Sequence, residues 1–434
     1  MATQTGYKVS ELGMIPQDWD VVEFGEVVEL FSSGSTPSRS QPQFFKGNNL
    51  WITSGELNYC VITDTIEKIS DSAIEQSNLK KHPVGTFLMA ITGLEAAGTR
   101  GSCAIVGAPA TTNQSCMAIY PNERLKTEFL YQWYVLNGNQ LAFKYCQGTK
   151  QLSYTASLLK KIPVLLPKST SEQTAIATAL SDTDVLISSL QTLIAKKKAI
   201  KLSVMQNLLS GKIRLPEFAQ RPDGSPKTTH QTELGCVPED WAVVELGEVG
   251  EPIIGLTYSP NDIDDNGVLV LRSSNIQSNK LVFDDNVFVK MAMPERVIVK
   301  ENDILICVRN GSRQLIGKCA LITKEAEGFA FGAFMSVFRT PFAPFIFYAF
   351  QSDKIQNQIK EIMGATINQI TNKDLREFKI AIPKSTAEQT AIAQLLSDMD
   401  AEIEALEGRL KKTQSLKQGM MQALLSGKIR LPLK

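Results

Sequence analysis

Arginine, lysine, asparagine and glutamine side chains gather in six stretches of the chain that also carry glycine or serine. Three lie in the first half, GSTPSRSQ (34–41), ITGLEAAGTRGS (91–102) and QGTKQLSY (147–154), and three in the second, LRSSNIQ (271–277), VRNGSRQLIGK (308–318) and GATINQITN (364–372). Arginine pairs with guanine, and asparagine or glutamine with adenine, in the major groove of DNA, and the same side chains hold phosphates. The candidate DNA contacts are Arg39, Arg100, Lys150, Gln151, Arg272, Arg309, Asn310, Arg313, Gln314, Asn368 and Gln369. Taken singly, each would ordinarily be a solvated surface side chain.

The sequence carries no recognisable catalytic motif. No GxGxxG stretch opens a helix after a strand, GLEAAGTR (93–100) lacks the glycine-lysine pair of a P-loop, and there is no Asn-Pro-Pro-aromatic element of an amino-methyltransferase. His82 and His230 are the only histidines, and because neither belongs to a metal or triad motif we expect both in surface or loop positions. The seven cysteines include no CxxC pair, which favours reduced, mostly buried thiols over disulfides or zinc. We expect a non-catalytic chain without a metal or cofactor of its own.

Charge is balanced, with 45 Lys and Arg against 45 Asp and Glu in 434 residues, so any basic surface has to be local. A hydrophobic fraction of 43% is enough for two or more cores. No apolar run approaches the roughly 18 residues of a membrane span. The opening MATQTGYKVSE lacks the basic and apolar regions of a signal peptide. These features predict a cytoplasmic protein without a membrane segment.

A long segment that occurs twice must position the candidate loops. Residues 167–216 and 383–432 align without a gap, and 29 of the 50 positions are identical. In the first copy Ser169 and Glu172 have the spacing of a capping box, Gly211 suits the left-handed residue that ends a helix, and the second copy repeats all three. Each copy is therefore predicted to be one long helix.

Apolar residues recur in both copies at coiled-coil spacing. They are Ile176, Leu180, Ile187, Leu190 and Ile194 in the first copy and Ile392, Leu396, Met399, Ile403, Leu406 and Leu410 in the second. A lone helix of about forty residues, roughly 60 Å long, could not bury this stripe, and the other copy is the candidate partner. The alternative is a pair of helices inside one ordinary core. The repetition of the whole helix sequence favours two equivalent halves related by a pseudo-twofold axis.

The segments before the long helices also repeat. SELGMIPQDWDVVEFGEVVE (10–29) returns as TELGCVPEDWAVVELGEVGE (232–251), in which Trp19 and Trp241 are expected to be hydrophobic anchors. The globular regions that follow diverge but share a frame of short apolar strands, Thr86–Ile91 with Asp303–Val308 and Gly101–Val106 with Gly317–Ile322. Helices are predicted at Thr127–Leu141 and Phe345–Ile362.

This pattern predicts an α/β fold with mixed α/β domains of roughly 140 residues. We place a first domain at 1–166, a first long helix at 167–216, a polar linker at 217–232, a second domain at 233–382, and a second long helix with a C-terminal tail at 383–434.

Several stretches together resemble a known family. They are GSTP near position 35, NNLWITSGEL, GTKQLSYTASLLKKIPVLLP, GATINQITNKDLREFKIAIP and the two EQTAIA helices. The resemblance runs over essentially the whole chain. The chain resembles the specificity (S) subunit of type I restriction-modification systems. It departs in GLTYSPND (255–262), which lacks the threonine-proline signature of its counterpart.

The resemblance implies two target-recognition domains joined by two long antiparallel coiled-coil helices with pseudo-twofold symmetry. Each domain would read one half of a bipartite site in double-stranded DNA. Two methyltransferase (M) subunits would bind around the helices and bring S-adenosylmethionine, and restriction/motor (R) subunits would bring ATP and Mg. The alternatives are a targeting subunit of another restriction or phage-defence system, a DNA-independent coiled-coil adaptor, and a self-contained nuclease or methyltransferase, against which the missing motifs count heavily.

Overall fold

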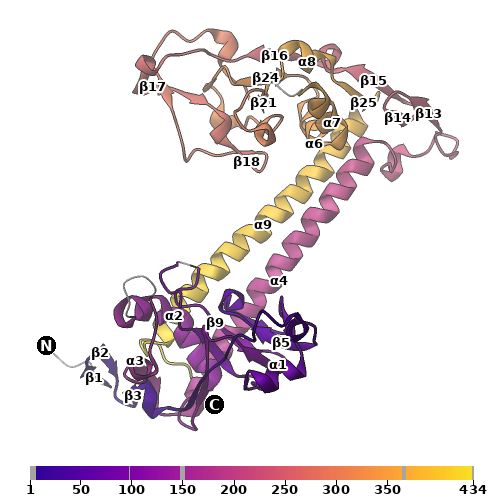
Figure 1. The fold of residues 1–434 in the computed structure, drawn as a ribbon. Helices are drawn as coiled ribbons and strands as arrows, with labels where there is room; N and C mark the ends of the chain where they lie inside the picture. The colour runs from indigo at the N-terminus through magenta and orange to yellow at the C-terminus, as the bar shows by residue number, and fades with distance from the viewer. Residues whose placement is uncertain (1–5, 97, 147–151, 364–367, 433–434) are drawn as a thin grey trace. The chain divides into compact units, whose positions relative to one another are not determined.

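The computed structural model describes residues 6–96, 98–146, 152–363 and 368–432. The chain forms two compact units: unit 1 is Met1–Gln191 with Gly408–Lys434, and unit 2 is Thr192–Glu407. Each unit contains one globular domain and part of both long helices, α4 (Thr170–Leu209) and α9 (Thr386–Leu424) (Figure 1). Within the described ranges every helix is too short or too polar to span a lipid bilayer.

The domain of unit 1 is built on a five-stranded sheet in the order β4-β11-β8-β9-β6. Its neighbouring strands are antiparallel except β9 and β6, and a second sheet pairs β5 with β10 in parallel and with β7. The elements are β1 (Tyr7–Ser10), β2 (Gly13–Pro16), β3 (Trp19–Glu23), β4 (Val28–Ser33), β5 (Asn49–Ile52), β6 (Cys60–Ile62), β7 (Lys68–Ile69), α1 (Asp71–Gln76), β8 (Phe87–Ala90), β9 (Cys103–Val106), β10 (Ala110–Thr112), β11 (Cys116–Pro121), α2 (Thr127–Tyr145), α3 (Ala156–Lys160) and β12 (Pro163–Pro167).

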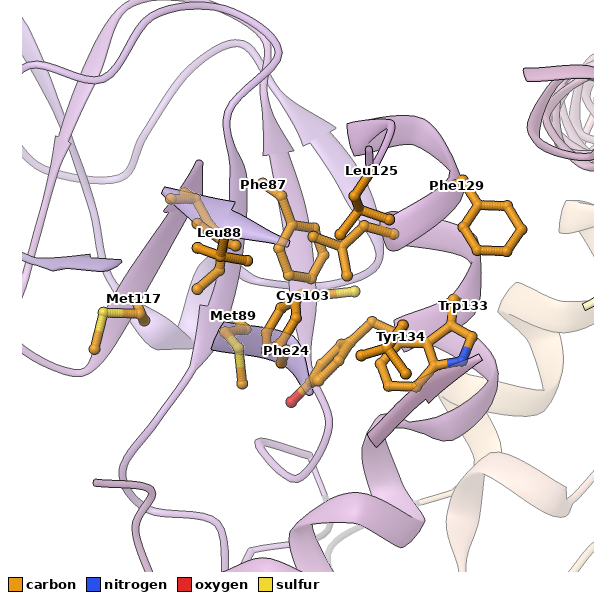
Figure 2. Packing of buried hydrophobic residues seen from close by; sticks show 14 of the residues in the cluster. Phe24, Phe87, Leu88, Met89, Cys103, Met117, Leu125, Phe129, Trp133 and Tyr134 are labelled. Carbon is orange, nitrogen blue, oxygen red and sulfur yellow. The ribbon is translucent and has the colours of Figure 1, made fainter. Parts of the chain in front are cut away.

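Helix α2 closes the core of this domain. Strand β8 is buried at all four positions, as a continuous apolar run in a central strand should be. Figure 2 shows side chains of β8 and α2 approaching each other, and the rings of Phe87 and Tyr134 meet edge to face with centroids 5.6 Å apart. Ile176 and Leu180 of α4 and Leu424 of α9 join the same core, so both long helices pack on the domain.

The domain of unit 2 repeats this frame. Its sheet order β16-β24-β21-β22 matches β4-β11-β8-β9, and β17 pairs with β23 in parallel as β5 does with β10. The elements are β13 (Thr229–Thr232), β14 (Gly235–Pro238), β15 (Trp241–Glu245), α5 (Leu246–Val249), β16 (Glu251–Ile254), β17 (Ile263–Leu271), β18 (Ile276–Gln277), β19 (Lys280–Leu281), β20 (Phe288–Val289), β21 (Ile304–Cys307), β22 (Cys319–Leu321), β23 (Ala330–Phe331), β24 (Met335–Arg339), α6 (Ala343–Gln351), α7 (Asp353–Ile362), α8 (Asn372–Glu377) and β25 (Lys379–Pro383). The predicted pair of mixed α/β domains is confirmed.

The two long helices pair in antiparallel fashion within each unit. In unit 1, Asp184 of α4 meets Lys417 of α9 at 2.6 Å. In unit 2, the ion pair Lys201–Asp400 is also 2.6 Å long. The residue number in α9 falls as that in α4 rises, as two antiparallel helices of a coiled coil require. Buried Leu190, Ile194 and Ile403 confirm the predicted apolar seam.

Charge segregation along the repeated helix favours this direction. The part of α4 in unit 2 carries lysines such as Lys197 and Lys198, and the part of α9 beside it is acidic; these lysines pair with Glu402 and Glu407 at 2.6 and 2.7 Å. The order of charge is the same in both copies. A parallel pair would therefore place like charges side by side, which selects against that alternative.

Each long helix ends on a glycine that packs against the leading segment of a domain. Gly211 has φ of +68°, and a Cβ atom there would lie 2.4 Å from the ring of Pro238. Gly427 repeats this with φ of +71° and the ring of Pro16 at 2.4 Å. The predicted left-handed stop is confirmed, and the close approach of proline excludes any larger residue.

A buried arginine joins the two helices to the leading segment of unit 2. Arg214 donates to Glu388 Oε1 and Oε2 at 2.9 and 2.6 Å and to Asp240 Oδ1 and Oδ2 at 2.7 and 2.9 Å. Trp241 Nε1 donates to Glu388 Oε2 at 3.3 Å. Partial burial opposes the charge of Asp240, yet hydrogen bonds from Arg214 and Lys227 lower its pKa to about 2. We call Arg214, Asp240, Trp241 and Glu388 the unit 2 clamp.

Unit 1 contains the same arrangement. Arg430 donates to Glu172, with Nη2 2.7 Å from Oε2, and to both oxygens of Asp18 at 2.8 and 2.7 Å. Trp19 Nε1 donates to Glu172 Oε2 at 3.3 Å. These four residues form the unit 1 clamp. Only one of the two hydrogen bonds of the predicted capping box at Ser169 is therefore present. Ser169 Oγ accepts a hydrogen bond from the Glu172 amide at 3.4 Å, but the Glu172 carboxylate accepts hydrogen bonds from Arg430 and Trp19 and not from the backbone amide of Ser169.

Two other predictions need correction. The helix predicted at Phe345–Ile362 is two helices, because Ser352 takes an extended conformation (ψ 151°) between α6 and α7 and its hydroxyl donates to Ala349 O at 2.6 Å. The polar stretch 217–232 is not a simple linker. Arg221 binds both carboxylate oxygens of Glu239 at 2.9 and 2.6 Å, and 229–232 forms β13.

His230 is exposed, and His82 lies outside the named strands and helices, so both fit the predicted surface or loop positions, but His82 is 1% exposed and is not a surface residue. Its Nδ1 lies 2.6 Å from the Tyr120 hydroxyl and its Nε2 3.4 Å from Thr112 Oγ1. Two polar neighbours let the neutral ring be buried, since a neutral imidazole has one donor and one acceptor. Desolvation, together with nearby Lys80, lowers the pKa of His82 from 6.5 to about 4.

This histidine should make unit 1 sensitive to acid. Because the pKa of His82 is lower in the folded chain, the unfolded chain binds more protons between about pH 6.5 and 4. The contribution to the free energy of unfolding is present above pH 6.5 and is lost towards pH 4, by at most about 3 kcal/mol. Urea unfolding at a series of pH values measures it. His82→Gln removes the titration, so a variant with the wild-type pH slope would contradict the assignment.

Candidate nucleic-acid interface

The candidate residues of unit 2 come together at the ends of β21 and β24. Arg309 and Gln369 form an antiparallel bridge outside the main sheet. The Ile370 amide donates to Val308 O at 2.8 Å, and the Arg309 amide donates to Phe334 O at 3.1 Å. The stretch 308–318 and residues 368–372, which are distant in sequence, are therefore adjacent at one end of the sheet.

Side-chain contacts extend this group. Arg313 Nε donates to Asn368 Oδ1 at 2.8 Å, and Asn368 Nδ2 donates to Gly311 O at 3.4 Å. Asn310 Nδ2 donates to Ser273 Oγ at 3.0 Å, which adds the stretch 271–277. Arg309, Arg313 and Gln314 are exposed, so the group offers cationic and amide groups to a ligand.

Arg272 is engaged within the fold. Its Nη2 lies 2.9 Å from Asp285 Oδ2 and 3.3 Å from Asp285 O. Its neighbour Ser273 accepts the hydrogen bond from Asn310 described above, so Arg272 borders the group. An arginine already held by a carboxylate is a poorer base reader than one that is not, because binding DNA would require breaking that pair.

In unit 1 the stretch 91–102 occupies the equivalent position. Thr92 and Ser153 form the bridge that corresponds to Arg309 and Gln369. Arg100 donates to Leu94 O at 2.8 Å and to Glu95 O at 2.6 Å, and its guanidinium lies 4.0 Å from the centroid of the Phe143 ring. Lys150 and Gln151 lie outside the described residues.

Arg39 lies elsewhere on the domain. It forms a two-point ion pair with Glu67, with N–O distances of 2.5 and 2.7 Å, and its guanidinium stacks 4.2 Å from the centroid of Phe45. The contacts of Arg39 and Arg100 have no residue in common. The structure therefore separates these two candidates of the first half, whereas it unites most candidates of the second.

The stretch that lacks the threonine-proline signature still follows the same path as its counterpart. A Cβ atom on Gly34 would lie 1.8 Å from Thr112 O, and one on Gly255 would lie 2.2 Å from Gly332 O. Leu256 forms a parallel bridge with Gly332. Both stretches thus leave the sheet at a close backbone contact that only glycine permits, and they differ in the residues that follow.

Two exposed phenylalanines were not identified from the sequence. Phe334 is 57% exposed beside Arg309, and Phe143 is 65% exposed beside Arg100. Phe334 directly precedes β24, where an apolar residue is expected to be buried, so no local pattern marks it as a surface residue. Within the described ranges, no group of three or more His, Cys, Asp or Glu side chains is arranged to hold a metal ion.

The chain thus contains two similar domains, and each domain packs on part of the same two long helices. The sequence matches the family described as the type I restriction modification DNA specificity domain, over residues 16–199 and 238–414. The chain belongs to that family.

Individual relatives have the same character. The type I restriction enzyme MjaIX specificity subunit of Methanocaldococcus jannaschii is 30% identical over 256 residues, 57% of this chain and 55% of that protein. The chain thus spans about half the length of that relative. The MjaVIII specificity subunit of the same organism is 23% identical over 96% of this chain and 94% of its own length. In fold, the chain is similar to the S subunit of a type I restriction-modification system from M. genitalium, with a TM-score of 0.57, 16% identity, and coverage of 96% and 97% of the two chains.

Proposed function

We propose that this chain is the DNA-recognition subunit of a type I restriction-modification complex, in which each domain reads one half of an asymmetric bipartite site. Membership of the specificity-domain family supports this role. One observation supports the proposal that the two domains read different half-sites: they share one frame but differ in their loops. The bridge Thr92–Ser153 of unit 1 corresponds in position to the bridge Arg309–Gln369 of unit 2. The same scaffold therefore presents different hydrogen-bonding groups, as two different half-sites require.

The partners follow from this role. Two methyltransferase subunits would dock symmetrically around the paired helices, and restriction subunits would join the assembly in the cytoplasm. S-adenosylmethionine, ATP and Mg would be bound by those partners, and this chain would contribute recognition only. The repeated helix sequence, with 29 of 50 positions identical, supports symmetric docking, because two copies of one partner need two equivalent surfaces.

The helix pair would set the spacer between the half-sites. Dimeric DNA-binding proteins fix the distance between half-sites through their geometry, and α4 and α9 are the elements shared by both units. Within each unit, ion pairs join the two helices and an apolar seam lies between them.

Replacing one domain tests the proposal directly. We expect that exchanging residues 252–382 for the matching domain of a relative will change one half of the methylated motif and leave the other half and the spacer unaltered. The measurement is the map of methylated adenines in a host that expresses the complex. The matched control exchanges residues 30–166 and should change only the other half. If either exchange alters both halves together, the two-reader model is wrong.

A further inference from the structure

Each unit presents a phenylalanine ring to solvent beside an arginine of its candidate interface. We infer that in unit 2 the Phe334 ring contacts the 5-methyl group of a thymine, next to a guanine bound by Arg309. The inference rests on the proposed function and adds to it the base types read at one place in the second half-site. It makes Phe334 a specificity-determining residue.

The first argument is the exposure of the ring and its pairing with Arg309. Phe334 is 57% exposed, and the Arg309 guanidinium lies 5.2 Å from the ring centroid. A cation over an aromatic face is held in place by the ring quadrupole. Within the described part of the chain no carboxylate is paired with Arg309. Its donors remain available to the O6 and N7 atoms of guanine, the base that arginine binds most often.

The second argument is that hydrogen bonds fix the backbone at both positions before DNA arrives. Phe334 O accepts hydrogen bonds from the amides of Val308 and Arg309, each at 3.1 Å. The next residue, Met335, is paired with Cys307 of β21 in the main sheet. Ring and guanidinium therefore project from neighbouring strand ends, and little backbone freedom remains to be lost on binding.

The third argument is the chemistry of the ligand. Phe334 lies beside the cation of Arg309, and Asn310, Arg313 and Gln369 belong to the same loop group, so Phe334 is an apolar side chain next to a polar, cationic group. In the major groove, the apolar group that distinguishes one base pair from the others is the thymine methyl. Adjacent base pairs lie about 3.4 Å apart, so a ring 5.2 Å from the guanidinium would meet a thymine within one or two pairs of the guanine.

Deoxyuridine substitution tests the contact, because deoxyuridine lacks only this methyl group. The complex of the full chain with its methyltransferase subunits is titrated with its target duplex and with duplexes in which each thymine of the second half-site is replaced in turn. We expect one replacement to weaken binding by roughly three- to fivefold, the effect of losing one buried methyl. Phe334→Ala should bind the thymine duplex more weakly and show no further loss at that position. Arg309→Gln should lose preference for the neighbouring guanine by roughly tenfold or more.

The matched control is Phe143→Ala, which removes the exposed ring of unit 1. It should keep the deoxyuridine response of the second half-site. Thermal unfolding checks that the Phe334 variant is folded, as expected for an exposed ring. If no deoxyuridine weakens binding, if Phe334→Ala keeps the full response, or if the second half-site contains no thymine, the inference is wrong and the proposed function stands. If the wild-type complex binds no DNA sequence preferentially, the proposed function itself fails.

Discussion

Arg214→Ala should destabilise unit 2 by about 3 to 5 kcal/mol, the usual cost of removing one partner from a buried ion pair. The side chains of Arg214 and Glu388 are only 8% and 1% exposed. Without the guanidinium, the Glu388 carboxylate retains the hydrogen bond from the Trp241 indole but remains buried with an unpaired charge. Hydrogen exchange of the β15 and β25 amides measures the change, and their protection should fall by roughly a hundredfold or more.

Two comparisons isolate the cause. Arg221→Ala removes an equally well-formed pair in the same unit, but Arg221 and Glu239 are 39% and 30% exposed, so the loss should be at most about 1 kcal/mol. The double replacement Arg214→Met with Glu388→Gln removes both charges and should recover most of the stability. A double variant as unstable as Arg214→Ala would show that lost packing, and not an unpaired carboxylate, explains the effect.

A heptad inserted into each long helix, after Ala195 and Lys411, should lengthen the preferred spacer. Seven residues keep the apolar seam in phase and add roughly 10 Å to each helix. With about 34 Å for ten base pairs, this corresponds to roughly three base pairs. Three pairs also rotate the far half-site by roughly 100°, so the DNA must twist or bend at a cost of a few kcal/mol. We therefore expect weaker binding overall, with both half-site sequences retained.

Selection from a library of spacer lengths measures this outcome. A five-residue insertion at the same points is the matched control, because at about 100° per residue it turns the apolar seam by roughly 140° away from the partner helix and should disrupt helix pairing instead of extending it. An unchanged preferred spacer in the heptad variant would show that the helices do not set the distance.

The long helices and their ends could be predicted from the sequence because local signals determine them. The apolar period, the serine-glutamate spacing and the terminal glycines act within a few residues. The repetition of the sequence identified each long helix as the partner of the other. The clamps could not be predicted in this way. Arg214 meets Glu388, which is 174 positions later, and the same Glu388 was assigned to a local capping box. Long-range charge pairing overrode the local preference of that carboxylate.

In the candidate interface, too, some features could be predicted from the sequence and others depend on contacts that only the fold creates. Composition picked out the loops, and the bridge between Arg309 and Gln369 brings two of them together. Composition could not show that Arg39 is held by Glu67 or that Arg100 donates to the backbone of its own loop. It also missed Phe334, since its sequence context resembles the start of a buried strand. The burial of His82 could not be predicted either, because a buried histidine needs polar neighbours that only the fold supplies.

The division of the chain into units constrains the order in which the protein can be completed during synthesis. Unit 2 is the continuous span Thr192–Glu407, whereas unit 1 needs Gly408–Lys434 to finish its core and to provide Arg430 for its clamp. Domains made first usually fold first as a chain leaves the ribosome. Here the domain that is translated first waits with part of its apolar surface uncovered until the other unit has been made. The half that begins the chain is therefore the half that closes last.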